Sequence, residues 1–174
     1  MKQPANSPKL EADVEAVWSA SQWCAVNVLV AVSGGADSMA LLRALLAIKT
    51  RRRGNGALLA GHVNHQLRGE QSEEDQKWLE QQCQSLDVPL VCARADPGAA
   101  AAADGDGIEA AARKVRYQML AEMAESVGAR FVAVGHHRDD QVETVLFRLL
   151  RGAGLRGLGG MRTFRPLSPS VSLV

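Results

Sequence analysis

The stretch that most constrains the fold of this chain is "NVLVAVSGGADSMALLRAL", residues 27–45. Its first six residues are mostly apolar and β-branched, which is typical of a strand buried on both faces. A Ser-Gly-Gly turn follows directly, and an apolar pattern with helical spacing begins after it. The glycines permit a sharp turn and a close approach of a ligand to the main chain. The amides at the start of the helix favour an anion. The stretch therefore predicts a strand–turn–helix unit that holds a phosphate group.

Strands and helices alternate along the rest of the chain. Short apolar runs predict strands at 57–64, 89–95 and 130–135, and periodic patterns predict helices at 8–23, 37–50, 73–86, 108–128 and 139–152. Residues 96–107 are expected to form a flexible loop, and 153–174 a Gly-rich tail. The alternation favours an α/β fold with a parallel sheet and crossover helices. Three strand ends carry polar segments, "SGGADS", "HVNHQLRGE" and "GHHRDDQVET", so an active site is expected at that edge of the sheet.

The composition excludes several classes of protein. With 47% hydrophobic residues and a formal net charge of +1, the chain is expected to form one globular domain and not a globally basic nucleic-acid binder. Arginines at 148, 151, 156, 162 and 165 make either a local phosphate-facing patch or a solvated face.

The three cysteines form no CxxC pair, so we expect reduced thiols, with Cys83 and Cys92 in the core. No signal peptide or membrane-length apolar run is recognisable, which predicts a soluble cytoplasmic protein.

The Ser-Gly-Gly loop narrows the phosphate chemistry. Ser33 and Ser38 add hydroxyl donors to the amides of Gly34 and Gly35, which suits a pyrophosphate. The loop lacks the lysine of a Walker motif and does not match GxGxxG. Asp37 is unusual there, because a carboxylate repels a phosphate unless it holds a Mg²⁺ ion or caps the helix. Both interpretations of Asp37 are open from the residues alone.

A basic group with one aromatic residue lies in "IEAAARKVRY". Glu109, Arg113 and Arg116 are spaced four and three apart, so they share one face of the predicted helix. The arginines can bind a phosphate or a nucleotide through a bidentate fork, or form an ordinary surface pair with the glutamate. The residues alone weight these two interpretations equally. Tyr117, the only tyrosine, is expected in the core, with stacking on a base as the alternative.

Five segments carry a resemblance to a known family. "SGGADS" resembles the phosphate loop of the N-type ATP pyrophosphatases of the PP-loop superfamily, which split ATP into AMP and pyrophosphate. With "HVNHQLRGEQSEED", "IEAAARKVRY", "GHHRDDQVETVLFRLLRG" and "GLRGLGGM", the chain is similar to the tRNA(Ile)-lysidine synthetase family over about residues 27–167. The resemblance implies a Rossmann-like fold of the adenine nucleotide alpha hydrolase type, with a parallel sheet and helices on both faces.

The resemblance further implies an ATP-dependent ligase of tRNA modification in the cytoplasm. ATP would adenylate the C2 carbonyl oxygen of the wobble cytidine in an isoleucine tRNA with a CAU anticodon, and pyrophosphate would leave. The ε-amine of free L-lysine would then displace AMP and give lysidine. The implied partners are ATP with Mg²⁺, free L-lysine and tRNA(Ile), with no membrane. A homodimer is compatible with the sequence.

Residue roles also follow from the resemblance. The residues implied to bind ATP are Ser33, Gly34, Gly35, Ala36, Asp37, Ser38, Val63 and Asn64, and Asp37 is implied to hold the Mg²⁺ ion. The residues implied in catalysis are Asp37, Arg116, Asp140 and Glu143. The residues implied to contact lysine or tRNA are Arg113, Arg116, His136, Asp140 and Glu143.

The chemistry of the "GHHRDDQVET" segment agrees with such roles. Asp140 and Glu143 are three apart and share a helix face, so they can bind the lysine ammonium, help to deprotonate it, or hold Mg²⁺. The plain alternative is that Asp139 and Asp140 cap the helix. A transition metal is disfavoured, because the adjacent His136 and His137 do not easily bind one ion together.

The expected division of the chain has three parts. Residues 1–26 form an N-terminal helix and lead-in, 27–167 the PP-loop ATP pyrophosphatase catalytic domain, and 168–174 a divergent tail. Family members usually continue beyond "RPL" with tRNA-binding domains, which we expect to be absent here. Two alternative functions are a PP-loop enzyme of tRNA thiolation, which would use a CxxC pair, and a truncated ATP-binding module without tRNA activity.

Overall fold

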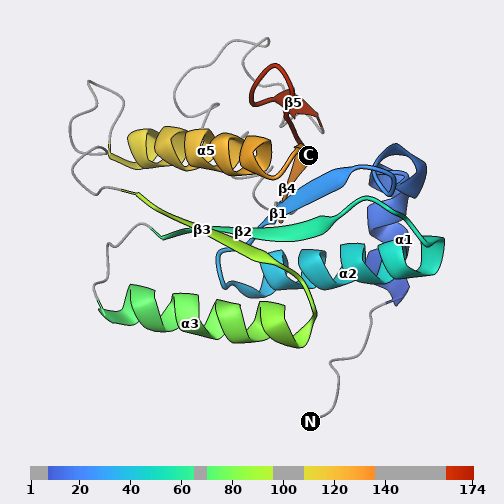
Figure 1. Ribbon diagram of the computed structural model, residues 1–174, viewed down its shortest axis with the longest axis horizontal. Helices are drawn as coiled ribbons and strands as arrows, with labels where there is room; N and C mark the ends of the chain where they lie inside the picture. The colour runs from blue at the N-terminus through green and yellow to red at the C-terminus, as the bar shows by residue number, and fades with distance from the viewer. Residues whose placement is uncertain (1–7, 65–69, 96–107, 136–163) are drawn as a thin grey trace, which may run out of the picture.

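The computed structural model describes residues 8–64, 70–95, 108–135 and 164–174 (Figure 1). The helices are α1 (Pro8–Val17), the 3₁₀ helix η1 (Ala20–Gln22), α2 (Ala36–Arg52), α3 (Glu70–Ser85) and α5 (Ile108–Ser126). The strands are β1 (Asn27–Ala31), β2 (Leu58–Asn64), β3 (Leu90–Arg94), β4 (Ala129–Val134), β5 (Arg165–Pro166) and β6 (Ser172–Leu173). The four strands expected from apolar runs are confirmed to within one or two residues at each end. The helix expected at 139–152 and the loop at 96–107 lie outside the described residues.

The strands form one sheet in the order β3-β2-β1-β4-β6-β5. β1 pairs in parallel with both β2 and β4, and β3 and β6 extend the parallel arrangement on either side. Only β5, at the edge of the sheet, is antiparallel to its neighbour. The expected parallel α/β sheet is therefore confirmed, with a short antiparallel hairpin added at one edge.

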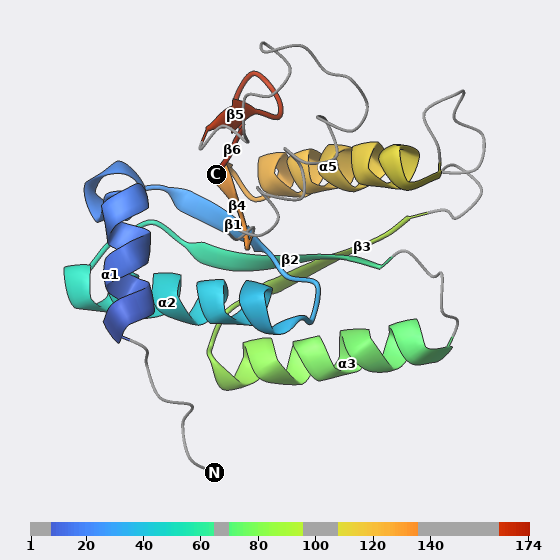
Figure 2. The same ribbon diagram turned by 180° about the vertical axis from the view of Figure 1, so that it is seen from behind.

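Helices cover both faces of the sheet, as expected. Figures 1 and 2 show α2 and α3 on one side of the strands and α5 on the other. Apolar side chains of α2, such as Leu42 and Leu45, pack against Val28 and Val30 of β1 on the first face. On the second face, Leu120 and other apolar residues of α5 pack against Leu29 of β1. β1 is buried on both sides, which agrees with its uninterrupted apolar sequence.

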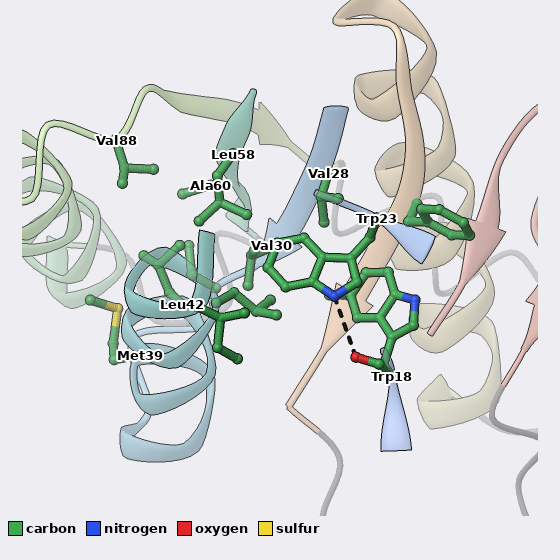
Figure 3. Close-up of a cluster of buried hydrophobic side chains, with 14 of the residues drawn as sticks. Trp18, Trp23, Val28, Val30, Met39, Leu42, Leu58, Ala60 and Val88 are labelled. Carbon is green, nitrogen blue, oxygen red and sulfur yellow. Dashed lines mark hydrogen bonds between the residues drawn. The ribbon is translucent and has the colours of Figure 1, made fainter. Parts of the chain in front are cut away.

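Two tryptophans join the N-terminal segment to the core of the first face. The Trp23 indole N–H donates to the Trp18 carbonyl oxygen at 3.4 Å, and the two ring centroids lie 5.3 Å apart (Figure 3). Trp18 also contacts the ring of Phe131 in β4, with centroids 5.3 Å apart. The expected single helix to residue 23 is wrong, because residues five apart lie on different sides of a helix. Ending α1 at Val17 lets both indoles point into the core.

The last residues of the chain belong to the sheet. The Val134 N–H donates to the Val174 carbonyl oxygen at 2.9 Å, and the Val174 N–H donates to the Val132 carbonyl oxygen at 2.8 Å. Val171 is 1% exposed and packs in the core of the second face. Within the segment that we expected to form a divergent tail, 168–174, residues Ser172 and Leu173 pair with β4 as strand β6. A strand of two residues is too short to show any periodicity in the sequence.

Of the two cysteines expected in the core, only one is buried. Cys83 is buried as expected, whereas Cys92 is exposed. Cys92 lies on β3, which is the edge strand of the sheet and has a neighbouring strand on one side only. Among the described helices, none is long and apolar enough to cross a membrane.

Candidate active site

The order of the strands defines where a ligand can bind. From β1 the chain moves to β2 and β3 on one side, and it returns through α5 to β4 on the other side of β1. Such a reversal opens a crevice at the carboxyl ends of the two strands that flank it. Ala31, at the end of β1, pairs with Val134, at the end of β4. The "SGGADS" and "GHHRDDQVET" segments therefore leave the sheet from neighbouring strands at this crevice.

Hydrogen bonds within the loop after β1 give it a closed shape. The Gly35 N–H donates to Ser33 Oγ at 3.4 Å, and the Ser38 hydroxyl donates to the Gly35 carbonyl oxygen at 2.9 Å. The Ser33 N–H donates to Ser38 Oγ at 3.2 Å, and the two hydroxyl oxygens lie 3.3 Å apart. Since the Ser38 proton is used on Gly35, the Ser33 hydroxyl is the donor between them. Both hydroxyls therefore hold the loop in shape, and they occupy the amides of Ser33 and Gly35. An anion can use the amides at the start of α2.

Glycine is required at the turn itself. Gly34 has φ +87°, a conformation that residues with a Cβ rarely adopt. Gly35 follows as the N-cap of α2 and has no side chain to cap the helix. The amides of the first helical turn have no acceptor within the helix. The start of α2 thus presents N–H groups and the positive end of the helix dipole to the crevice.

Gly135 joins the end of β4 to this loop. A Cβ at Gly135 would lie 3.1 Å from the Ser38 nitrogen, and 3.2 Å from the carbonyl carbon and oxygen of Asp37. These are main-chain atoms, so they cannot rotate out of the way as a side chain would. The close approach places the backbone at the end of β4 directly against the first turn of α2.

Asp37 lies in the first turn of α2 and is exposed. The N-cap is Gly35, so the interpretation of Asp37 as a plain N-cap is wrong. Magnesium is commonly held by one or two carboxylates together with phosphate oxygens and water. The described residues contain no cluster of three or more His, Cys, Asp or Glu side chains that could hold a metal alone. The exposed carboxylate of Asp37 beside the phosphate loop fits a Mg²⁺ ion held by one carboxylate together with phosphate oxygens and water.

The end of β2 lies on the other side of β1. His62 is buried, and its Nδ1 lies 2.9 Å from the Val32 carbonyl oxygen, so it is a packed histidine. The Asn64 carbonyl oxygen accepts a hydrogen bond from Ala95, and its side-chain amide donates to Gln76 Oε1 at 3.2 Å. Asn64 therefore connects β2 to β3 and α3.

Val63 is oriented differently from Asn64. Its main-chain N–H and C=O groups point to the same side of β2 as those of Gly61, whose carbonyl oxygen accepts a hydrogen bond from the Val32 N–H. The pairing of β2 with β1 ends at Gly61. The main chain of Val63 consequently faces the side of β1 beyond the end of that strand. Of Val63 and Asn64, which the resemblance implies in ATP binding, Val63 is the better placed for a main-chain contact with a ligand.

The arginines of α5 lie on the second face of the sheet. Tyr117 is buried, as expected, and the guanidinium carbons of Arg113 and Arg116 lie 5.2 and 5.6 Å from its ring centroid. Arg165 of β5 approaches the same ring to 4.6 Å. From the sequence, Arg165 was expected only as part of a general basic region. Nothing local in the sequence connects it to residue 117.

The remaining residues assigned in the sequence analysis fall outside the described part of the chain. They are His136, Asp139, Asp140 and Glu143, together with the side chain of Glu109. The structure shows the strand end from which the first four continue, at Gly135 beside the phosphate loop.

The chain was compared with known proteins. The PP-loop domain family matches residues 8–172. The tRNA(Ile)-lysidine synthases of Geobacter sulfurreducens and Deinococcus radiodurans are 44% and 47% identical to it, over 136 and 138 residues respectively. Each alignment covers 78% of this chain, but only 28% and 22% of the two relatives. The chain thus spans less than a third of the length of these curated relatives.

A solved structure has the same fold. The U34-tRNA thiolase NcsA from Methanococcus maripaludis superimposes with a TM-score of 0.68 at 18% sequence identity, over 85% of this chain and 51% of the thiolase. At that identity the likeness shows the fold alone. It confirms the expected adenine nucleotide alpha hydrolase type of sheet.

Proposed function

The chain belongs to the PP-loop domain family, and on this basis we propose that it carries the ATP-dependent step of a ligase that converts the wobble cytidine of tRNA(Ile) to lysidine. ATP transfers its adenylyl group to the C2 carbonyl oxygen of the cytidine, and the bond to pyrophosphate breaks. The ε-amine of L-lysine then attacks C2, loses a proton, and displaces AMP with that oxygen. The proposed location is the cytoplasm.

The observation that supports this proposal most directly is the geometry at the crevice. The "SGGADS" loop is closed by its own serine hydroxyls and leaves the amides of α2 for an anion. The end of β4 packs against that loop through Gly135. A strand end in this position can bring catalytic carboxylates to a bound nucleotide. The curated relatives named tRNA(Ile)-lysidine synthase support the choice of substrate.

The residues of this chain have distinct parts in the proposal. The amides of Gly34 and of residues 36–38 bind the phosphates, and the main chain at Val63 contacts the adenosine, with Asn64 holding the strand end beside it. Asp37 would hold Mg²⁺, whose positive charge offsets the charge of the phosphates. Arg113, Arg116 and His136 bind lysine or tRNA.

Lysine activation is assigned to the carboxylates. Asp140 and Glu143 bind the lysine ammonium and take its proton, and Arg116 takes part in catalysis. The expectation of a homodimer stays a prediction.

Two alternatives are less well supported. A thiolation enzyme of the PP-loop group would need paired reactive cysteines, whereas Cys24 and Cys83 are buried and the sequence has no CxxC pair. A nucleotide-binding module without tRNA activity would share the phosphate loop, so only turnover distinguishes it from the ligase.

The test is AMP release from labelled ATP by the purified chain with Mg²⁺, L-lysine and a tRNA(Ile) transcript that carries a CAU anticodon. AMP release that requires both tRNA and lysine would support the ligase. ATP binding without turnover would reduce the proposal to the nucleotide-binding module. A chain that does not bind ATP at all would refute it.

The Asp37→Ala variant tests the proposed metal-binding residue. We expect it to lower the rate of AMP release by at least about 100-fold, because a group that stabilises developing charge is removed. Its thermal unfolding should match that of the wild type, since Asp37 is exposed. Asp13→Ala is the matched control, because Asp13 is an exposed aspartate on a helix outside the crevice. Full activity of Asp37→Ala would remove the proposed role.

A further inference from the structure

Three arginines from distant parts of the chain gather around one buried tyrosine. The guanidinium carbons of Arg113, Arg116 and Arg165 all lie within 5.6 Å of the Tyr117 ring centroid. The first two belong to α5, and Arg165 is brought to them by the β5–β6 hairpin. We call Arg113, Arg116 and Arg165 the arginine cluster.

The Tyr117 ring is a rigid surface on which the arginine cluster packs. Its side chain is buried in the core that α5 forms with β4 and β6. The negative face of an aromatic ring attracts guanidinium groups and holds their planes in place. Arg113 and Arg165 are exposed, and Arg116 is half-buried, so the guanidinium groups rest on a rigid ring and still reach solvent.

The charges of the cluster are not neutralised by carboxylates in the part of the chain that the structure describes. Three other arginines there are paired: Arg51 and Arg52 with glutamates of α1, and Arg94 with Glu73 at 3.5 Å. No described carboxylate lies within ion-pair distance of Arg113, Arg116 or Arg165. Three like charges held close together repel one another, and a bound anion would relieve that repulsion.

The position of the cluster separates it from the phosphate loop. The loop begins α2, which covers the first face of the sheet, whereas α5, which carries Arg113 and Arg116, covers the second face, and β5, which carries Arg165, is an edge strand of the sheet (Figure 2). The sheet lies between α2 and α5, which favours a second phosphate-bearing molecule at the arginine cluster over the nucleotide phosphates at the start of α2. In a ligase that acts on tRNA, that molecule is the RNA.

We propose that Arg165 completes an RNA-binding site with Arg113 and Arg116, in which three guanidinium groups on the Tyr117 ring bind backbone phosphates of the RNA substrate. The inference rests on the proposed function and adds Arg165 to it. Guanidinium forks match phosphate oxygens in a bidentate geometry that lysine does not reproduce. Phosphate contacts of this kind position an RNA and carry little sequence information.

The test compares Arg165→Gln with Arg130→Gln in the full chain. Arg130 is a matched control, because it is exposed and lies 5.8 Å from the ring of Phe131, with no second arginine recorded on that ring among the described residues. The probe is a fluorescently labelled anticodon stem–loop of tRNA(Ile) with a CAU anticodon, and its anisotropy is measured over a series of KCl concentrations. ATP binding is measured in parallel by calorimetry.

We expect Arg165→Gln to weaken RNA binding roughly tenfold at low salt, and to reduce the slope of log K against log salt by about 0.7 to 0.9, the loss of one phosphate contact. Arg130→Gln should change neither quantity, and ATP affinity should be unchanged in both variants. Arg165→Lys should recover part of the affinity, because it restores the charge without the fork. Both glutamine variants should unfold at the wild-type temperature, since both side chains are exposed.

Several results would overturn the inference. Equal RNA binding by Arg165→Gln and Arg130→Gln would remove Arg165 from the site. Weaker ATP binding with unchanged RNA binding would assign the cluster to the nucleotide. A wild-type chain that binds ATP but not the stem–loop would refute the RNA site and leave the ATP chemistry standing, whereas a chain that binds neither would refute the proposed function itself.

Discussion

Replacing Gly135 with alanine should disturb the phosphate loop without removing any polar group of the site. The added Cβ would lie 3.1 Å from the Ser38 nitrogen and 3.2 Å from two main-chain atoms of Asp37. Contacts this short with backbone atoms are relieved only if β4 or the first turn of α2 moves by a few tenths of an ångström. The phosphate loop is part of that turn, so the movement changes the positions of its amides.

The size of the effect follows from the cost of overpacking. Inserting one carbon into a well-packed region costs about 1–3 kcal/mol. If the strain appears only when the loop is held in its ATP-bound shape, the dissociation constant for ATP should rise roughly 5- to 150-fold. If the free protein already carries the strain, the free energy of unfolding should fall by the same amount. The loss of ATP-binding free energy and the loss of unfolding free energy should therefore add up to about 1–3 kcal/mol.

Gly61→Ala is the matched control for Gly135→Ala. Its added Cβ would also be crowded, at 3.0 Å, but by the buried side chain of Leu29 and not by the main chain of the phosphate loop. We expect a loss of stability and no change in ATP affinity. The assays are calorimetric titration with ATP and urea unfolding followed by tryptophan fluorescence. A Gly135→Ala protein that matched the wild type within about 0.5 kcal/mol in both assays would refute the proposed contact between β4 and the loop.

Two further predictions concern stability. Lys49 is 8% exposed, its Nζ has no hydrogen-bond partner among the described residues, and burial lowers its pKa from the usual value of 10.5. Lys49→Met should therefore raise the free energy of unfolding at pH 7 by about 1–3 kcal/mol. The buried charge lowers the stability of the wild type fully below the lowered pKa of Lys49 and not at all above the usual pKa. The stability that Lys49→Met gains over the wild type should therefore shrink as the pH rises toward 10.5. Urea unfolding that gave the same gain in the free energy of unfolding at pH 7 and pH 10 would contradict this. Val171→Ala should lower the free energy of unfolding by about 2 kcal/mol, because the valine is buried beside β4. Val17→Ala, at an exposed position, should change it little. Equal effects of the two substitutions in urea unfolding would argue against β6 as part of the core.

Much of the candidate site could be predicted because its signals are local. The "SGGADS" loop needs glycine for the turn at Gly34, and a buried strand and an amphipathic helix flank it. The burial of Tyr117 was also expected from the sequence. Whether Asp37 caps α2 was undecidable from the sequence, because two adjacent glycines leave the helix start uncertain by a residue or two.

The amino-acid sequence by itself determined the order of strands and helices, the glycine turn, and the presence of polar segments at the strand ends. Each of these depends on side-chain periodicity or on a backbone conformation that neighbouring residues impose. Tertiary structure alone decided that β4 lies beside β1 with Gly135 against the loop, that the last residues complete the sheet, and that Arg165 reaches Tyr117. Those contacts join residues far apart in the chain, and their energy comes from burial and pairing that no local pattern records.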